Sequence, residues 1–336
     1  DEKNKFRLYG STFLEIEFIE GLKFKTLLGG DFDYSLREEF RPSTIGRYRN
    51  DVSSVVPWAK EKTKSRKNII SENTLNYAKD INKHSINLLG GYSYQKETRK
   101  DIFVNAPTLD SNNIENVAGT SETTSSKDVF EWVKISYFGR AQYDYDSKYL
   151  LSASIRRDGS SRFGPNTKFG NFSSASAGWV VSNEDFFPEN SVVSKLKLRY
   201  SWGQSGNDQI GNFGSIATLK SLNGLIDGGL APGQIPSASP NADLSWETSV
   251  TNNFGFDLGL LNGKLNLVVD YFIAKTEDML LNVPVPLQSG FTRSLQNVGK
   301  MENKGLEIVL STSNINLGPV TWNSSVNFTT INNEVT

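Results

Sequence analysis

Residues 264–276 read Lys-Leu-Asn-Leu-Val-Val-Asp-Tyr-Phe-Ile-Ala-Lys-Thr, and one set of alternating positions in this segment is wholly apolar. The apolar positions are Leu265, Leu267, Val269, Tyr271 and Ile273. The positions between them are mostly polar, as at Asn266 and Asp270. A period of two is typical of a β-strand whose two faces meet different surroundings. The segment is therefore predicted to be a strand with one apolar and one polar face.

The same alternation recurs along most of the chain. It is found in segments 22–34, 85–95, 129–145, 148–156, 195–203, 250–260, 306–310 and 320–330. We expect about twelve such strands, many of roughly ten or more residues, which is about twice the usual length in globular proteins. A tilted strand needs roughly 9–11 residues to cross a bilayer. The predicted fold class is therefore all-β, a transmembrane antiparallel β-barrel, with residues 1–336 belonging to one barrel domain.

Short and long connections alternate between these strands. The short ones have the Asn, Asp and Gly chemistry of hairpin turns, as at Asp146-Ser147 and Leu261-Asn262-Gly263. The long ones are rich in Ser, Asn, Gly and Pro, and are expected at about 35–65, 98–128, 207–244 and 279–303. An outer-membrane barrel has this asymmetry, because its periplasmic turns are tight and its extracellular loops are long.

Composition excludes several classes of function. Lys and Arg number 36 against 37 Asp and Glu, so the net charge of −1 gives no reason to expect a nucleic acid partner. The chain has no cysteine and one histidine, His84, which lies at a predicted short turn. Disulfides, Cys-based metal sites and catalytic triads are therefore excluded, and we expect no enzyme activity, no metal site and no cofactor. No apolar run approaches the roughly 20 residues of a membrane-spanning helix.

Aromatic residues gather near the predicted strand ends, where Tyr and Trp favour the headgroup level of a bilayer. The residues expected in such a girdle are Tyr143, Tyr149, Trp179, Trp202, Trp246 and Trp322. Aromatic residues in the predicted long loops are candidates for ligand contact. These loop candidates are Tyr48, Trp58, Phe103 and Phe213.

Charged residues fall on the polar positions of the predicted strands, because a charge facing lipid near the midplane would cost about 2–4 kcal/mol. The candidates for lining the lumen are Arg140, Arg156, Lys197, Arg199, Asp257 and Asp270. Placement of this kind is required by any membrane barrel. Some of these groups could in addition line a substrate path or hold another part of the protein by salt bridges.

Several motifs resemble the barrel of the SusC/RagA family, which are TonB-dependent outer-membrane transporters of Bacteroidota. The matching segments are Ser154–Gly164 (SIRRDGSSRFG), Ala177-Gly178-Trp179, Leu198–Asn207 (LRYSWGQSGN), Pro240–Glu247 (PNADLSWE), Val269–Phe272 (VDYF) and Asn297–Glu307 (NVGKMENKGLE). The resemblance extends over roughly residues 129–307, and the earlier part is similar only in style.

The resemblance implies a barrel of about 22 strands with an N-terminal plug and a TonB box. The sequence holds about half of those strands and neither of the other parts, so we expect it to be an internal stretch of a longer chain. The implied function is TonB-dependent import of oligosaccharides or oligopeptides across the outer membrane. The implied partners are a SusD-like surface lipoprotein, the TonB complex, outer-membrane lipid and a glycan or peptide ligand.

Two other functions stay open at this point. A passive porin, or a structural SusC-like barrel in a larger envelope complex, would show the same alternation. A soluble β-rich glycan-binding module is a further alternative, in which the apolar positions would pack against a second layer of protein. The side chains of Leu196, Leu198, Leu265 and Leu267 distinguish the membrane from the soluble alternative, because in a soluble module they would be buried.

Overall fold

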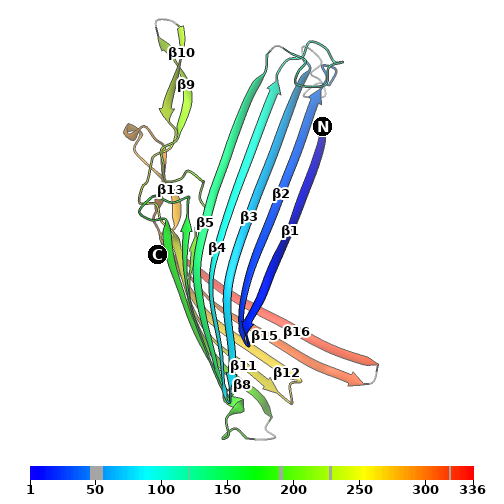
Figure 1. Cartoon of the computed structure of the whole chain (residues 1–336), viewed down its shortest axis with the longest axis vertical. Coiled ribbons are helices and arrows are strands. Elements are labelled where there is room, and N and C mark those ends of the chain that lie inside the picture. Colours follow the sequence, from blue (N-terminus) through cyan, green and yellow to red (C-terminus); the bar gives the residue numbers. More distant parts are fainter. Residues whose placement is uncertain (46–55, 121, 189–191, 227–228, 318) are drawn as a thin grey trace. The chain divides into compact units, whose positions relative to one another are not determined.

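The computed structural model describes residues 1–45, 56–120, 122–188, 192–226, 229–317 and 319–336. Within these ranges, twelve strands form one antiparallel sheet in which the sheet strands follow each other in chain order (Figure 1). They are β1 (Glu2–Ile19), β2 (Leu22–Arg41), β3 (Trp58–Ile81), β4 (His84–Ala106), β5 (Thr124–Tyr145), β6 (Tyr149–Ser160), β7 (Phe169–Val180), β8 (Val193–Asn207), β11 (Glu247–Leu260), β12 (Leu265–Glu277), β15 (Met301–Leu317) and β16 (Val320–Val335). The prediction of about twelve consecutive antiparallel strands is confirmed.

Two short hairpins and two single-turn 3-10 helices lie in the connections. The hairpins are β9 (Leu219–Ile226) with β10 (Gly229–Pro236), and β13 (Leu280–Pro284) with β14 (Arg293–Asn297). The 3-10 helices are η1 (Val181–Asn183) and η2 (Leu287–Ser289). Both hairpins lie within the long connections expected at about 207–244 and 279–303. Among the described residues, no helix has the length and apolar character needed to cross a membrane.

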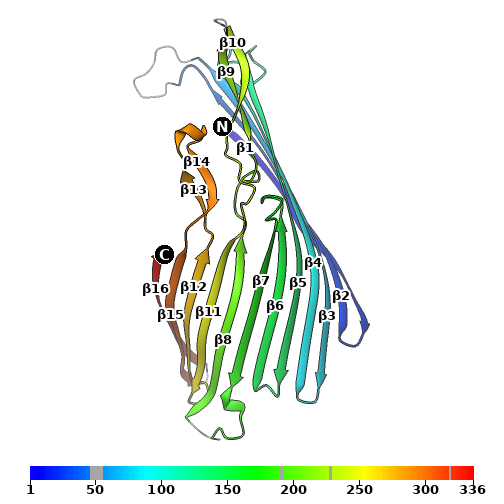
Figure 2. The same ribbon diagram turned by 90° about the vertical axis from the view of Figure 1, so that its left-hand side faces the viewer.

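Tight turns join the strands at one end, as their residue types predict. Asp146 and Ser147 both have positive φ angles, of 54° and 53°, as a two-residue hairpin turn of the right twist requires. Leu261, Asn262 and Gly263 also have positive φ angles and join β11 to β12. Figure 2 shows β6, β7, β8, β11 and β12 side by side with these turns at their lower ends.

Two long connections are shorter than the sequence indicated. β2 continues to Arg41 and β3 begins at Trp58, so about half of the expected loop at 35–65 is strand. The expected loop at 98–128 is likewise reduced, because β4 reaches Ala106 and β5 starts at Thr124. The alternation signal fails here because the outward positions of β3 near its start, such as Glu61 and Thr63, are polar. The start of β3 is therefore a strand even though its two faces do not differ in polarity.

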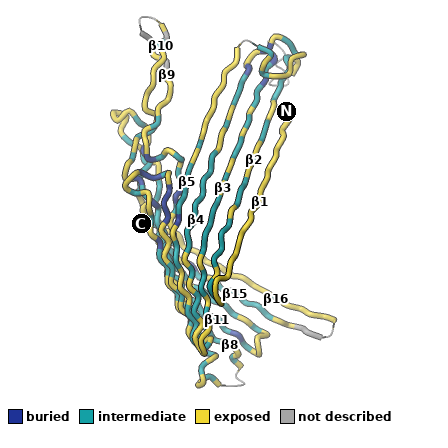
Figure 3. Tube along the Cα trace, viewed as in Figure 1, coloured by how far each residue is buried: buried dark blue, intermediate teal, exposed yellow. Residues whose placement is uncertain are grey.

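The chain divides into two compact units. Unit 1 comprises residues 1–14, 26–72 and 93–134, and unit 2 comprises residues 15–25, 73–92 and 135–336. Buried side chains are few in both, and most sheet positions are half-buried or exposed (Figure 3). The buried cluster of unit 1 is Ala59, Ala106 and Leu109, and that of unit 2 is Phe163, Phe172, Leu244 and Trp246.

In unit 2, one face of the sheet exposes large apolar side chains. Tyr200 pairs in register with Phe254, and Phe254 pairs with Tyr271, so these three rings lie on one face of three neighbouring strands. All three are at least 40% exposed. A contiguous exposed apolar surface of this kind marks contact with a membrane or another protein. We call it the apolar face, and the opposite side of the same strands the polar face.

The four leucines that distinguish the membrane from the soluble alternative support the membrane assignment. Leu198 is 43% exposed, and Leu196, Leu265 and Leu267 are half-buried. None of the four is a buried residue, so none is packed into a dry interior. The soluble module is therefore disfavoured.

Adjacent positions on β12 test the assignment of the two faces. Leu267 pairs with Leu258 and Leu310 on the apolar face, whereas Val268 pairs with Asp257 and Val309 on the polar face. We expect Leu267→Lys to destabilise the complete protein in lipid by about 2–4 kcal/mol, since it places a charge in hydrocarbon. Urea unfolding of the protein in lipid vesicles measures this. Val268→Lys is the matched control and should cost much less; equal costs would contradict the assignment.

Candidate functional site

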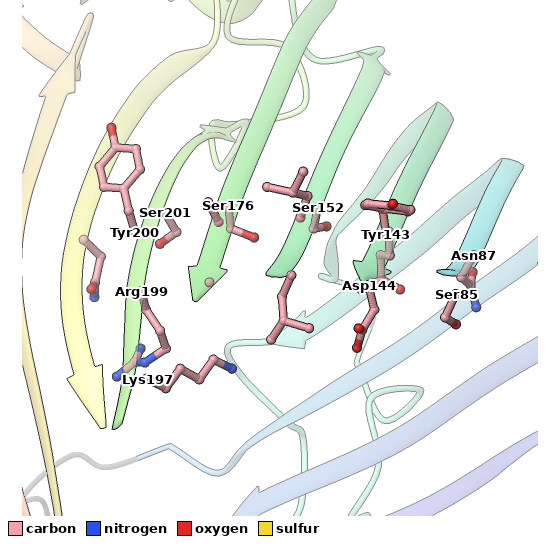
Figure 4. Close-up of a pocket in the computed structure, with 16 residues that line it drawn as sticks. Ser85, Asn87, Tyr143, Asp144, Ser152, Ser176, Lys197, Arg199, Tyr200 and Ser201 are labelled. Atoms are coloured by element: carbon pink, nitrogen blue, oxygen red, sulfur yellow. The ribbon is translucent and has the colours of Figure 1, made fainter. Parts of the chain in front are cut away.

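The polar face of unit 2 has a hollow of about 530 Å³ lined by residues of β4, β5, β6, β7, β8 and β11 (Figure 4). Serines and amides make up much of its wall, as at Ser152, Ser176 and Asn253. Asp144 is a charged lining residue from β5, and Lys197 and Arg199 come from β8. The hollow is thus a polar surface with charges of both signs.

Arg199 is the centre of an ion-pair network that joins three strands. Its Nε donates to Oδ1 of Asp257 on β11 at 2.9 Å. Its two terminal nitrogens donate to both carboxylate oxygens of Asp270 on β12 at 3.0 Å. A bidentate guanidinium–carboxylate pair is stronger and more directional than a single ammonium contact. Side chains from β8, β11 and β12 are therefore held at fixed positions on the polar face.

Gly255 makes this network possible. It pairs with Arg199 on one side and Asp270 on the other. A Cβ atom at this position would lie 2.9 Å from Nη2 of Arg199 and 2.4 Å from Oδ1 of Asp270. The missing side chain leaves the space in which the guanidinium crosses β11 to reach β12. Sequence reasoning did not single out Gly255, because a glycine within an alternating strand has no periodic signal.

The other lumen candidates are placed separately from this network. Lys197 is opposite Asp257 in register and lines the same hollow. Arg156 forms a second group, in which it donates to Asp158 at 2.8 Å and to Ser136 at 2.8 Å. Arg140 is exposed and belongs to neither group. Their role in lining a lumen stays a prediction.

The loop aromatics are found in different settings. Trp58 is the first residue of β3, where the ammonium of Lys60 lies 4.5 Å from the ring centroid. Phe103 lies within β4 and is half-buried, so neither residue is in a loop as expected. Phe213 is exposed in the connection after β8, and Tyr48 lies outside the described residues. Phe213 therefore remains as a loop candidate for ligand contact.

Trp246 corrects the predicted girdle. It is only 6% exposed, and its ring packs 5.0 Å from Phe163 and 5.4 Å from Phe172. Its indole nitrogen donates to the carbonyl oxygen of Lys168 at 3.2 Å. Trp246 lies just before β11 begins and folds onto the connection between β6 and β7. It is therefore a core residue of a loop cluster, not a residue of an exposed girdle.

Three of the segments that carry the family resemblance, those around Gly164, Trp246 and Asn297, meet in this loop cluster. Thr167 donates to the carbonyl oxygen of Leu244 at 2.6 Å, and Asn297 exchanges hydrogen bonds with the backbone of Ser245 at 2.8 and 2.9 Å. Gly164 is required for the close approach, because a Cβ atom there would overlap the carbonyl oxygen of Ala242. The motifs thus tie three connections together and have a structural role.

Several of the expected girdle aromatics form a row on the apolar face beside the short turns. Tyr149 stacks 6.5 Å from Trp179, and Tyr145 lies 6.3 Å from Tyr149. Next to them, the exposed His84 shares a hydrogen bond of 2.6 Å with Tyr143. Trp202 is half-buried and Trp322 is exposed, each on its own strand. Membrane contact by these residues stays a prediction.

A charged cluster beside this row joins the β5–β6 turn to the segment after β7. Glu184 accepts a hydrogen bond from the indole of Trp179 at 2.8 Å, and Lys148 donates to Asp185 at 2.9 Å. The hydrogen bonds from Tyr149 and then Trp179 lower the pKa of Glu184 below its ordinary value of 4.5. Hydrogen bonding to Asp185 raises the pKa of Lys148. These contacts therefore favour the charged forms of Glu184 and Lys148 and hold the β5–β6 turn against the segment after β7. We call these residues the rim cluster.

In the part of the chain that the structure describes, no group of three or more His, Asp or Glu side chains has the arrangement of a metal site. The site is a charged and hydroxyl-rich surface, and it has the chemistry of weak, reversible contacts with a polar molecule.

Known proteins show the same barrel. Residues 8–336 match the family described as TonB dependent receptor-like, beta-barrel. TonB-dependent receptor P3 of Formosa agariphila is 33% identical over 340 residues, which cover 100% of this chain and 33% of that protein. TonB-dependent receptor SusC of Bacteroides thetaiotaomicron is 35% identical over 207 residues, covering 60% of this chain and 21% of SusC.

A solved structure titled as the RagAB peptide transporter superposes with a TM-score of 0.90 at 28% identity. The match covers 99% of this chain and 37% of the other. This chain therefore spans about a third of the length of the relatives that it matches along its whole length.

The Arg199 network generates a stability prediction. We expect Arg199→Gln to destabilise the complete protein by roughly 1–3 kcal/mol, because it leaves two half-buried carboxylates without their cation. Urea unfolding in lipid vesicles, followed by tryptophan fluorescence, measures the loss. Arg140→Gln removes the same charge from an exposed position on the polar face and should change stability by less than about 0.5 kcal/mol. Equal losses from the two variants would show that the network adds nothing.

The rim cluster generates a pH prediction. Since the folded-state pKa of Glu184 is lowered, its stabilisation is fully present above the ordinary value of 4.5 and is lost as pH falls through the folded value. Glu184→Gln should therefore lower thermal stability at pH 7 and flatten its decline in acid. Melting of the complete protein between pH 7 and pH 3 measures both effects. Glu20→Gln, at a turn carboxylate that is 93% exposed, is the control; an unchanged acid limb in Glu184→Gln would contradict the assignment.

Proposed function

Because the chain belongs to the TonB dependent receptor-like β-barrel family of the bacterial outer membrane, we propose that it forms part of the wall of a SusC-like importer. The complete protein would move oligosaccharides or oligopeptides inward through the outer membrane. The family match along residues 8–336 is the observation that carries this proposal. It is supported by strands that expose an apolar face and carry ion pairs on the opposite face.

In this proposal the wall is a rigid frame. The bidentate contact between Arg199 and Asp270 and the second contact to Asp257 hold three strands in one register. Hydroxyl and amide groups, such as those of Ser152, Ser176 and Asn253, offer a passing solute weak hydrogen bonds in place of water. Transport needs no covalent chemistry here. Gating and energy coupling would belong to parts of the protein outside this segment.

Two partners follow from the proposal. A SusD-like lipoprotein would cap the outer mouth and retain the oligomer, and the inner-membrane TonB complex would supply energy. The long connections that follow β8 and β12 are the segments of unit 2 that we expect on the lipoprotein side, because they lie at the strand ends opposite the tight turns.

Uptake by cells that produce the complete protein tests the proposal. We expect saturable uptake of labelled oligosaccharides or oligopeptides, and a fall of about tenfold or more when the gene for TonB is deleted, because the substrate would then meet a closed barrel. A passive pore would instead admit the label equally with and without TonB. Uptake of a monosaccharide through the general porins of the same cells is the control and should not change.

A further inference from the structure

β3 carries a row of cations on one face. Lys60, Lys62, Lys64 and Arg66 occupy alternate positions, so their side chains leave the same side of the strand. Alternate residues of a strand are about 7 Å apart, and the row is therefore about 20 Å long. We call these four residues the cationic ladder. It lies within unit 1.

Neighbouring strands extend the ladder into a positively charged hollow of about 370 Å³. Lys3 and Lys5 of β1, Arg37 of β2 and Arg99 of β4 line it together with Lys62, Lys64 and Arg66. Asp33 is the single carboxylate in the described lining. A surface with this charge balance attracts anions.

Asp31 and Glu97, the carboxylates beside Arg66, are less exposed than the cations that line the hollow. Arg66 forms ion pairs with Asp31 and with Glu97, the latter at 3.6 Å. The side chains of Asp31 and Glu97 are 15% and 20% exposed, whereas those of Lys64 and Arg99 are 49% and 46% exposed. Asp31 and Glu97 therefore pair with the terminal nitrogens of Arg66 from recessed positions. Arg37 is paired with Asp1, whose side chain is 53% exposed, and with Glu39, so Arg37 adds little free positive charge to the hollow.

Three of the cations that line the hollow have no ion pair among the described residues. Among the described residues, no carboxylate lies within ion-pair distance of Lys3, Lys5 or Lys62, although Lys64 and Arg99 both contact Asp101. An exposed ammonium group without a partner is available to a ligand. The opposite face of the same strands exposes Phe6 and Phe32, so the cationic side is the one that faces water.

We propose that the cationic ladder and the hollow beside it bind an extended oligomer that carries carboxylate or sulfate groups, and that such anionic oligomers are the substrate class of the complete protein. This inference rests on the proposed import function and narrows its substrate. The row of alternating cations fits a chain with a repeating negative charge better than a compact anion. Arg99, whose guanidinium lies 4.4 Å from the ring centroid of Phe130, adds a flat surface at one side of the hollow.

Calorimetric binding to the purified complete protein tests the inference. The acidic probes are a hexamer of galacturonate, a chondroitin sulfate hexasaccharide and hexaglutamate; the neutral probes are maltohexaose and hexaglutamine. We expect at least one acidic probe to bind about tenfold or more tighter than its neutral counterpart, and to weaken as sodium chloride is raised. The acidic probe that binds identifies the source of the anion as glycan or peptide.

Paired variants on β3 locate the binding. Lys62→Gln with Lys64→Gln should weaken the acidic probe by roughly three- to tenfold, because two exposed charges are removed. Lys67→Gln with Lys79→Gln removes the same charge from the opposite positions of the strand and should have no effect. Both double variants should migrate in gels as folded barrels, which excludes a folding defect.

Three results would overturn the inference: no binding of any acidic probe, equal binding of neutral probes, or full binding by the Lys62 and Lys64 double variant. TonB-dependent uptake of neutral oligomers would leave the proposed function intact and refute only the substrate class. Binding of acidic oligomers without TonB-dependent uptake would refute the proposed import function and leave the anion-binding site intact.

Discussion

Every strand of this sheet must satisfy two surroundings at once. In unit 2, one set of alternate side chains is mostly apolar and the other mostly polar, and few described side chains of either set are buried. In an ordinary globular protein, one face of the sheet packs against a hydrophobic core. Here the sheet itself is the boundary, because the backbone groups are satisfied between strands and the side chains differ on the two sides.

The polar face has ion pairs because of this arrangement. On β8, β11 and β12, the charged side chains of Arg199, Asp257 and Asp270 lie on the polar face, where neighbouring strands bring them within a few ångströms of each other. In unit 2 they are balanced, as Arg199 is with Asp257 and Asp270. In unit 1 the carboxylates Asp31 and Glu97 are recessed and the cations project. The first arrangement stabilises strand positions, whereas the second leaves charge available to a ligand.

The segments that carry the family resemblance have a structural role. The segments that resemble the SusC/RagA family around Gly164, Trp246 and Asn297 meet in a small buried cluster that fastens three connections. This packing requires glycine at position 164, because a Cβ atom there would overlap the carbonyl oxygen of Ala242.

The alternation of side chains along single strands was enough to predict the fold class, the number of strands, the tight turns and the apolar and polar positions, because these depend on residues close in sequence. It could not predict that Trp246 is buried, that Gly255 makes room for Arg199, or that β3 begins at Trp58. Trp246 is buried because a connection packs onto another connection, and Gly255 makes room for Arg199 because of the register of β8, β11 and β12. Both depend on hydrogen bonds and packing between segments far apart in the chain, so only the tertiary structure decides them.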